Sequence, residues 1–161
     1  MKDIKYIRGD ATNPIGSGNK IIIHCCNDCV PGKWGAGFVL SLSKRWKEPE
    51  RQYQRWSTGT YNKPYKLGQV QFVNVEDDIV VANMIGQHGV GFNNGNPPIR
   101  YDAIDDCLKR VAILAMEHNA SIHSPRFGSG LARGKWSEIE KLIVENLCAK
   151  NIDVTVYDFV K

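Results

Sequence analysis

The sequence predicts one α/β domain in which helices cover both faces of a largely parallel sheet of about six strands. Short runs of β-branched and aromatic residues alternate along the chain with segments whose apolar residues repeat at helical spacing. Such alternation is typical of a parallel sheet with crossover helices. The length of 161 residues and the apolar content of 42% suit a single domain over residues 1–161 with a sizeable core.

The six expected strands are short and bounded by polar or glycine-containing segments. They cover residues 4–8, 21–24, 70–75, 79–84, 121–124 and 154–159. Only Glu76, Asp77 and Asp78 separate the third strand from the fourth. Because this link is too short for a crossover, we expect an antiparallel hairpin there and therefore a mixed sheet.

Four helices are expected between the strands. The clearest covers residues 137–150, where Ile139, Leu142, Ile143 and Leu147 repeat on one face and Ser137 is a candidate N-cap. A second covers residues 101–118, after Pro97 and Pro98. Two shorter helices are expected over residues 37–46 and 49–56, the latter beginning with Pro-Glu.

Charge and cysteine content narrow the class of protein. The net charge of +4 arises from 21 basic and 17 acidic residues without long charged runs, which suits an anionic small ligand better than a dedicated nucleic-acid binder. The first residues lack the apolar stretch of a secretory signal, and no window is long enough for a transmembrane helix. We therefore expect a cytoplasmic protein with no membrane partner, whose five cysteines form no disulfide framework.

Two glycine-rich segments each follow an expected strand and precede an expected helix. Residues 32–38 read GKWGAGF, and residues 125–136 read PRFGSGLARGKW. Glycine lets a ligand approach the backbone closely, and N–H groups near a helix start favour an anion. Because open sheets bind ligands beyond the carboxyl ends of their strands, the pair predicts a site for a nucleotide diphosphate held from two sides. A plain glycine-rich turn is the alternative, and the missing Gly-Lys-Ser/Thr argues against a nucleoside triphosphatase.

The sequence resembles a macrodomain, a member of the family that binds ADP-ribose and its derivatives, over nearly its whole length. The likeness is carried by Gly9-Asp10 and Val156-Tyr157, and by residues 23–28 (IHCCND), 34–38 (WGAGF), 82–87 (ANMIGQ) and 125–132 (PRFGSGLA). It implies a three-layer α/β/α fold and no cofactor. It also implies ADP-ribose, ADP-ribose 1''-phosphate or ADP-ribosylated macromolecules as binding partners.

The resemblance also implies which residues contact the ligand. Asp10, beside Ala11, would accept a hydrogen bond from the adenine amino group, and Phe159 would contact the adenine. A turn cap for Asp10 and a core position for Phe159 are equally open. The distal ribose and one phosphate would lie against the first glycine-rich segment, at Gly35, Ala36, Gly37 and Phe38. Backbone donors for the diphosphate would come from the second, at Gly128, Ser129, Gly130, Leu131 and Ala132, and Phe127 would also bind the ligand.

Three residues are candidates for catalysis. Within the family the likeness is greatest to ADP-ribose 1''-phosphate phosphatases, in which Asn27 would bind the distal ribose. Asp28 would then orient or activate a water, and His88 would donate a proton. An idle, solvent-exposed His88 and a non-catalytic ADP-ribose reader are the alternatives.

A second enzymatic alternative is the removal of ADP-ribose from modified protein or nucleic acid. Some similar macrodomains do this with a lysine and an aspartate, whose positions correspond here to Gln87 and Ala132. Neither side chain can act as a nucleophile or base, which argues against that mechanism. Arg133 also departs from the small residue that the resemblance leads us to expect.

Two further patterns have competing interpretations. His24, Cys25, Cys26 and Cys29 lie close together, but Cys107 and Cys148 are isolated in helices, so we expect small buried residues rather than a metal site or a redox pair. Basic and aromatic residues that interleave in the next part of the chain suit either nucleic-acid stacking or a helix that packs its aromatics. They are Arg45, Trp46, Arg51, Tyr53, Arg55, Trp56, Tyr61 and Tyr65.

Overall fold

The structure, a computed structural model, describes residues 2–60, 62–92, 94–130 and 132–159. One six-stranded sheet has the order β1-β6-β5-β2-β4-β3. Strand β3 pairs with β4 antiparallel, and every other neighbouring pair is parallel, so the expected mixed sheet is confirmed. The strands are β1 (Lys5–Arg8), β2 (Lys20–Asn27), β3 (Val70–Glu76), β4 (Ile79–Gln87), β5 (Ser121–Ser124) and β6 (Val154–Asp158).

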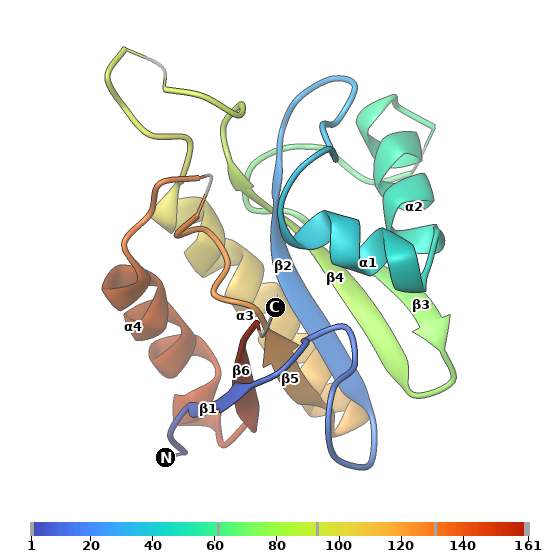
Figure 1. Cartoon of the computed structure of the whole chain (residues 1–161), viewed down its shortest axis with the longest axis vertical. Helices are drawn as coiled ribbons and strands as arrows, with labels where there is room; N and C mark the ends of the chain where they lie inside the picture. The colour runs from blue at the N-terminus through green and yellow to red at the C-terminus, as the bar shows by residue number, and fades with distance from the viewer. Residues whose placement is uncertain (1, 61, 93, 131, 160–161) are drawn as a thin grey trace.

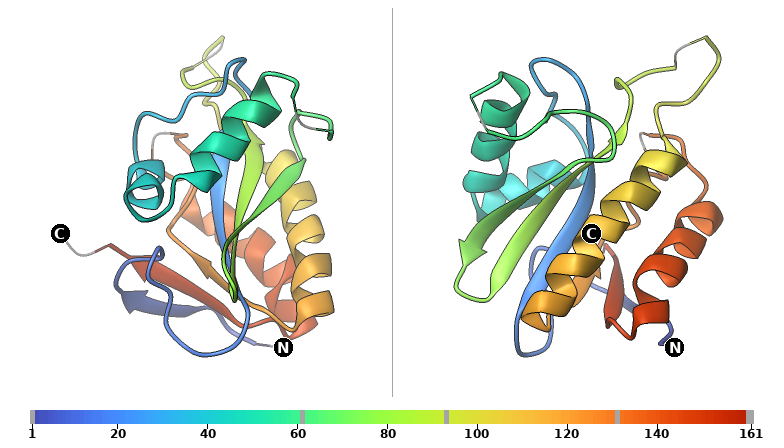
Figure 2. Two further views of the ribbon diagram at one scale, coloured as in Figure 1. Left: turned by 90° about the vertical axis from the view of Figure 1, so that its right-hand side faces the viewer. Right: turned by 180° about the vertical axis from the view of Figure 1, so that it is seen from behind.

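Helices cover both faces of this sheet. Helices α1 (Phe38–Arg45) and α2 (Glu48–Ser57) lie on one face, and α3 (Tyr101–His118) and α4 (Trp136–Asn146) lie on the other (Figures 1 and 2). The three-layer α/β/α architecture expected from the sequence is thus confirmed. Among the described residues, no helix has the length and apolar character needed to cross a membrane.

The central strand β2 shows how the sequence produces two cores. All its residues except Cys25 are buried, because helices cover it on both sides. Side chains alternate between the faces of a strand, so Ile21 and Ile23 join the core beneath α3 and α4 while Ile22 and Cys26 join the core beneath α1 and α2. The polar end of this strand is therefore held by two packed layers.

The C-terminal helical region differs from the expectation. Helix α4 begins at Trp136, after an extended Lys135, so Ser137 lies inside the helix and is not its cap. The α-helix ends at Asn146, and a short 3₁₀ turn (Cys148–Lys150) follows. The chain leaves this turn through Asn151 with φ of 60°, a left-handed conformation in which asparagine is favoured and the helix cannot continue.

Strands β2 and β4 both extend three residues beyond their predicted ends. Periodicity missed these residues because the extension of β2 ends in a polar side chain, Asn27, and that of β4 in Gln87. The register shifts by one residue at the end of the pair, so that Asn27 lies opposite Gln87. At the intervening Gly86, a Cβ atom would lie 2.8 Å from the Cys25 Sγ and 2.9 Å from the Ile104 Cγ1, so only glycine fits.

Candidate ligand-binding cavity

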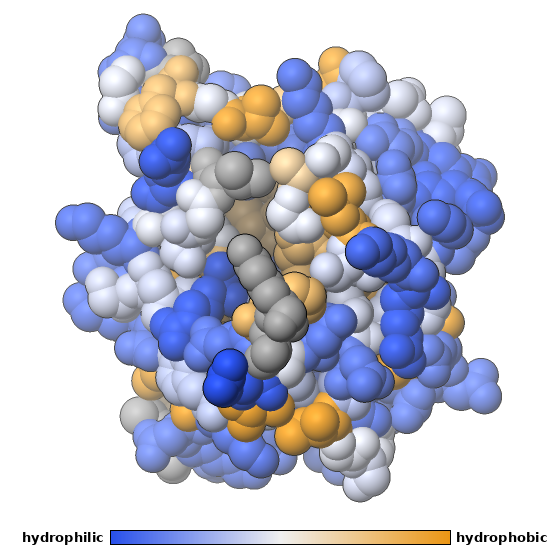
Figure 3. Space-filling view, viewed as in Figure 1, coloured by the Kyte–Doolittle hydropathy of each residue, from blue (hydrophilic) through white to orange (hydrophobic). Residues whose placement is uncertain are grey.

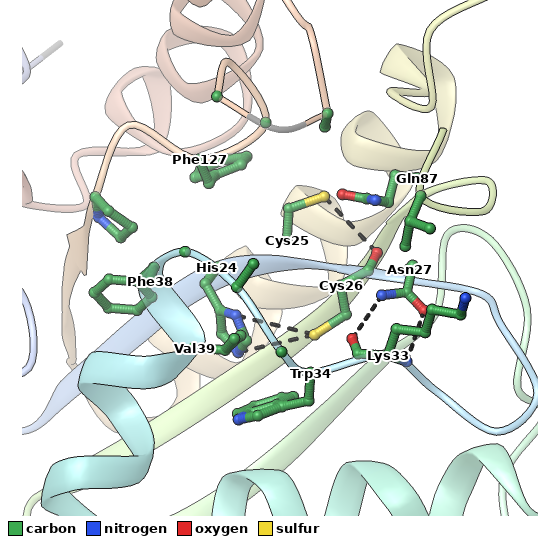
Figure 4. Close-up of a pocket in the computed structure, with 18 of the residues that line it drawn as sticks. His24, Cys25, Cys26, Asn27, Lys33, Trp34, Phe38, Val39, Gln87 and Phe127 are labelled. Carbon is green, nitrogen blue, oxygen red and sulfur yellow. Dashed lines mark hydrogen bonds between the residues drawn. The ribbon is translucent and has the colours of Figure 1, made fainter. Parts of the chain in front are cut away.

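A cavity of about 490 Å³ opens beyond the carboxyl ends of β2, β4 and β5. Figure 3 shows that the molecular surface is hollowed near the centre of the face that is turned towards the viewer. We call residues 28–38 the first wall and residues 125–135 the second wall, because each runs from a strand towards a helix along one side of the cavity (Figure 4). The volume falls within the range of small-molecule sites.

Nine of the residues predicted to bind ligand line this cavity. They are Asn27, Gly35, Ala36, Gly37, Phe38, Phe127, Gly128, Gly130 and Ala132. Gln87, the residue at the position of the lysine in some similar macrodomains, also lines it, as does Ala132 at the position of the aspartate. The two walls therefore meet around one space, as the paired glycine-rich segments predicted.

Other predicted residues lie outside the lining. Asp28, His88, Asp10, Ala11, Ser129 and Phe159 are not among the described residues that border the cavity, and Leu131 lies outside the part of the chain that the structure describes. Ala11 is buried, whereas Phe159 is exposed and is not a core residue. Ser129 donates its hydroxyl hydrogen bond to the Arg126 carbonyl at 3.1 Å.

Asp10 follows β1 and caps a turn. Its Oδ1 atom accepts hydrogen bonds from both the backbone N–H and the hydroxyl of Thr12, each at 2.8 Å. This geometry is the turn-cap interpretation considered for Asp10, and it engages only one of the two carboxylate oxygens. A contact between Asp10 and adenine stays a prediction.

The glycines in the walls have two different roles. A Cβ atom at Gly35 or Gly130 would meet no atom within 4 Å, so the backbone there borders open space. At Gly128, which has φ of 77°, a Cβ atom would lie 2.8 Å from the Ile99 Cδ1 and 2.9 Å from the Ile139 Cδ1. At Gly134 it would lie 2.5 Å from the Gly128 carbonyl oxygen. Gly128 and Gly134 are therefore required for packing, while Gly35 and Gly130 leave room for a ligand.

The Asn27 side chain is engaged mainly by the protein itself. Its Oδ1 atom accepts from the backbone N–H groups of Cys29 and Lys33, each at 3.2 Å, and lies 2.9 Å from the Tyr53 hydroxyl. Its Nδ2 atom donates to the Lys33 carbonyl at 2.7 Å. An amide nitrogen carries two hydrogens, so one Nδ2–H can still donate to a ligand.

Asp28 and His88, which lie 60 residues apart in the chain, form a hydrogen-bonded pair. The Nδ1 atom of His88 lies 2.7 Å from the Asp28 Oδ2, and the Asp28 Oδ1 accepts from the Gly89 N–H at 2.8 Å. Although neither lines the cavity, both adjoin residues that do, because Asp28 follows Asn27 and His88 follows Gln87. Pairing of Nδ1 with a carboxylate orients the ring and leaves Nε2 to exchange a proton.

His24 lies beneath the first wall with a fixed tautomer. Its Nε2 atom is 2.6 Å from the Asn83 Oδ1, and the Asn83 amide donates to the carbonyl of Pro49 and to the side chain of Gln71. The His24 Nε2 therefore carries the hydrogen. Burial lowers the pKa of His24 to about 4, so the ring is neutral, and it packs edge-on against Trp34 at 5.4 Å between centroids.

Of the neighbouring cysteines, Cys26 is buried, whereas Cys25 is half-buried and borders the cavity. Burial raises the pKa of Cys25 to about 12 and raises that of Cys26 well above its usual range. Thiolates, the form that binds metals and attacks disulfides, are thus disfavoured. Among the described residues, no group of three His, Cys, Asp or Glu side chains is arranged to hold a metal ion.

The aromatic residues of α2 favour helix packing over nucleic-acid stacking. Tyr53 is fully buried, and Trp56 is 1% exposed, so neither ring can stack on a base. Tyr65 packs edge-on against Trp56 with centroids 5.3 Å apart. Tyr61 lies outside the described residues.

Arg126 is a cavity residue that the sequence interpretation did not select. Its Nε atom donates to the Asp158 Oδ1 at 2.6 Å and its Nη2 atom to the Asp158 Oδ2 at 3.3 Å. The guanidinium also lies over the rings of Tyr6 and Trp136, at 4.9 and 5.5 Å from their centroids. Its position two residues after the end of β5 was the available signal. Arg133, with φ of 63°, has its guanidinium carbon 5.9 Å from the centroid of the Phe92 ring.

The fold and the cavity define a class, namely an α/β/α domain with a ligand site between two glycine-rich walls at the carboxyl edge of a mixed sheet. No model of a known protein family matches the sequence. Solved structures do. A protein of unknown function from Bacteroides thetaiotaomicron is 55% identical with a TM-score of 0.92, each chain covered to 98%. A macrodomain protein from Streptomyces coelicolor is 48% identical with a TM-score of 0.85, over 97% of this chain and 99% of that one.

Curated relatives are more distant. The mouse chromodomain-helicase-DNA-binding protein 1-like is 28% identical over 97% of this chain, which spans only 18% of that relative's length. An ADP-ribose 1''-phosphate phosphatase from Lodderomyces elongisporus is 25% identical over 96% of this chain and 99% of its own. Given the near-complete match to the Streptomyces protein, the chain belongs to the macrodomain family.

Proposed function

We propose that this chain binds ADP-ribose in the cavity and hydrolyses ADP-ribose 1''-phosphate to ADP-ribose and phosphate. The observation that carries the binding proposal is the pair of walls around one cavity, with Gly35 and Gly130 both bordering open space. A diphosphate can approach the backbone there without meeting a side chain. The adenine would lie towards Asp10 and Phe159, and the distal ribose beside Asn27.

Hydrolysis is supported by the Asp28–His88 pair at the Asn27 end of the cavity. The relative from Lodderomyces, similar over its full length, bears the name of this activity. The positions occupied by Gln87 and Ala132 disfavour the lysine-dependent removal of ADP-ribose from macromolecules, since neither side chain can act as a base or nucleophile.

The proposed reaction needs one water and one exchangeable proton. The water oxygen bonds to phosphorus, and the bond between phosphorus and the ribose 1'' oxygen breaks. That oxygen leaves with the electron pair and takes a proton from the His88 imidazolium, which Asp28 orients. The water keeps one hydrogen as a hydroxyl of the released phosphate, and its other proton restores His88.

Release of phosphate from ADP-ribose 1''-phosphate tests the proposal. We expect turnover by the wild-type protein, and a decrease of about 100-fold in kcat with a nearly unchanged KM for His88→Gln, the loss typical of a missing general acid. His118→Gln, at the exposed end of α3, is the matched control and should retain wild-type activity. Binding of ADP-ribose without turnover by the wild type would overturn hydrolysis and make the protein a reader.

A further inference from the structure

The first wall is attached to α2 and to the loop that follows α2 by side chains outside the cavity. The Tyr53 hydroxyl lies 2.7 Å from the Asn27 carbonyl oxygen and 2.9 Å from the Asn27 Oδ1. The Tyr65 hydroxyl donates to the Cys29 carbonyl at 2.6 Å and lies 3.1 Å from that of Asn27. The two hydroxyls are also 3.2 Å apart, so they form one network around the start of the wall.

The middle of the first wall is fixed to α2 as well. The Gly32 N–H donates to the Ser57 hydroxyl at 2.9 Å, and the Gln54 Nε2 donates to the Gly32 carbonyl at 2.8 Å. A Cβ atom at Gly32 would lie 2.3 Å from the ring of Tyr53, so the loop backbone packs directly on this tyrosine. Residues 53, 54 and 57 share one face of α2, which is the spacing that lets one helix hold both the start and the middle of the first wall.

Both phenols are suited to act as permanent donors. Burial raises the pKa of Tyr65 to about 12 and raises that of Tyr53 further, so both hydroxyls keep their hydrogens at neutral pH. The Tyr53 ring also packs on Trp34, at 5.3 Å between centroids, and Trp34 lines the cavity. The hydroxyl contact of Tyr53 with Asn27 and its ring contact with Trp34 connect α2 to the cavity surface.

We propose that Tyr53 and Tyr65, which we call the clamp, are positioning residues that fix the first wall against α2 and the loop after it and thereby shape the distal-ribose end of the cavity. The effect on ligand rests on the proposed binding of ADP-ribose, whereas the effect on the loop does not. With the hydroxyls in place, the loop holds Asn27 at the cavity and Asp28 beside His88. Without them, the carbonyls of Asn27 and Cys29 lose their donors, and the loop is released while both rings still fill their sites.

The test uses Tyr53→Phe, Tyr65→Phe and the double variant. Calorimetric titration should show that the double variant binds ADP-ribose about tenfold or more weakly, a loss in the range expected for buried carbonyls without donors. Affinity for ADP should fall less, because ADP lacks the distal ribose beside Asn27 and keeps only the diphosphate contact with the first wall. Equal losses for both ligands, or no loss for either, would overturn the proposal.

A second measurement separates this inference from the proposed function. Amide hydrogen exchange at Cys29 and Lys33, whose N–H groups bond to Asn27, should accelerate about tenfold in the double variant and less in Tyr65→Phe, which removes one hydroxyl at a half-buried site. Tyr157→Phe removes a hydroxyl bonded to His123 and Ile15 elsewhere in the fold and should leave these two amides unchanged. Unchanged exchange in every clamp variant would overturn the clamp, whether or not the wild type binds ADP-ribose.

Discussion

The two walls of the cavity are held by different means. In the first wall, polar side chains of β2 and α2 bond to the loop backbone, from Asn27 at its start to Ser57 behind Gly32. In the second wall the backbone bonds largely to itself, with the Gly134 N–H donating to the Gly128 carbonyl at 2.7 Å and the Arg133 N–H to the Gly130 carbonyl at 3.1 Å. Glycine packing makes these close turns possible.

This difference indicates how each wall can change. A wall held by side chains can be loosened by removing a single hydroxyl outside the cavity. A wall held by its backbone tolerates side-chain changes but not added volume at the glycines that close it. Each wall also lies beyond a strand that holds a neutral buried histidine, His24 in β2 for the first and His123 in β5 for the second.

The largest expected effect is the loss of stability on acidification, to which both histidines contribute. Burial lowers the pKa of each to about 4 from the ordinary value of 6.5, so protons favour the unfolded chain. The contribution of the two neutral histidines to the free energy of unfolding is full above pH 6.5. It is lost as the pH falls towards 4, by at most about 1.4 kcal/mol per pH unit for each histidine. Denaturant unfolding from pH 7.5 to 4 measures the slope, and His24→Gln or His123→Gln should each reduce it. An unchanged slope in both variants would contradict this account.

Gly134→Ala should test the second wall independently of the first. The added Cβ atom would lie 2.5 Å from the Gly128 carbonyl oxygen, so the bond that closes the wall must shift. We expect a loss of about 1–3 kcal/mol in the free energy of unfolding, typical of overpacking, together with weaker ADP-ribose binding. Thermal unfolding and calorimetry provide the two measurements. A variant as stable as wild type would show that backbone closure does not hold this wall.

Gly130→Ala should affect binding without affecting stability. Its Cβ atom would point into open space and its φ is not left-handed, so the fold accepts alanine there. A diphosphate against the backbone would meet the methyl group, and we expect affinity for ADP-ribose to fall about tenfold with an unchanged Tm. Gly35→Ala is the matched variant in the first wall. If both alanine variants bind like wild type, the ligand does not approach these glycines.

The sequence predicted the fold and the two walls because their signals are local. Runs such as Ile21–Ile23 and the glycines of residues 125–136 are readable within a short window. The clamp is not, since Tyr53 and Tyr65 lie 26 and 38 residues from Asn27 and contact it only in the folded chain. The buried ring of Tyr53 agrees with the helix-packing interpretation, whereas Tyr65 lies in the loop after α2, and the hydroxyl contacts of both have no sequence pattern.

For the candidate catalytic pair, the sequence suggested the two residues but not their contact. Asp28 and His88 were selected separately, by their residue types and by their positions after β2 and β4, and the parallel pairing of those strands brings them to 2.7 Å. Arg126 was missed because its contacts, with Tyr6, Trp136 and Asp158, come from three other segments. Residue chemistry could thus suggest roles, and only the sheet order could show which residues meet.

Calorimetric titration of the wild-type protein with ADP-ribose is the decisive experiment for the cavity between the two walls. We expect saturable binding of one ligand per chain, with ADP binding more weakly because it makes no contact beside Asn27. Absence of any heat or thermal shift at millimolar ADP-ribose would contradict the assignment of the cavity between the two walls as an ADP-ribose site.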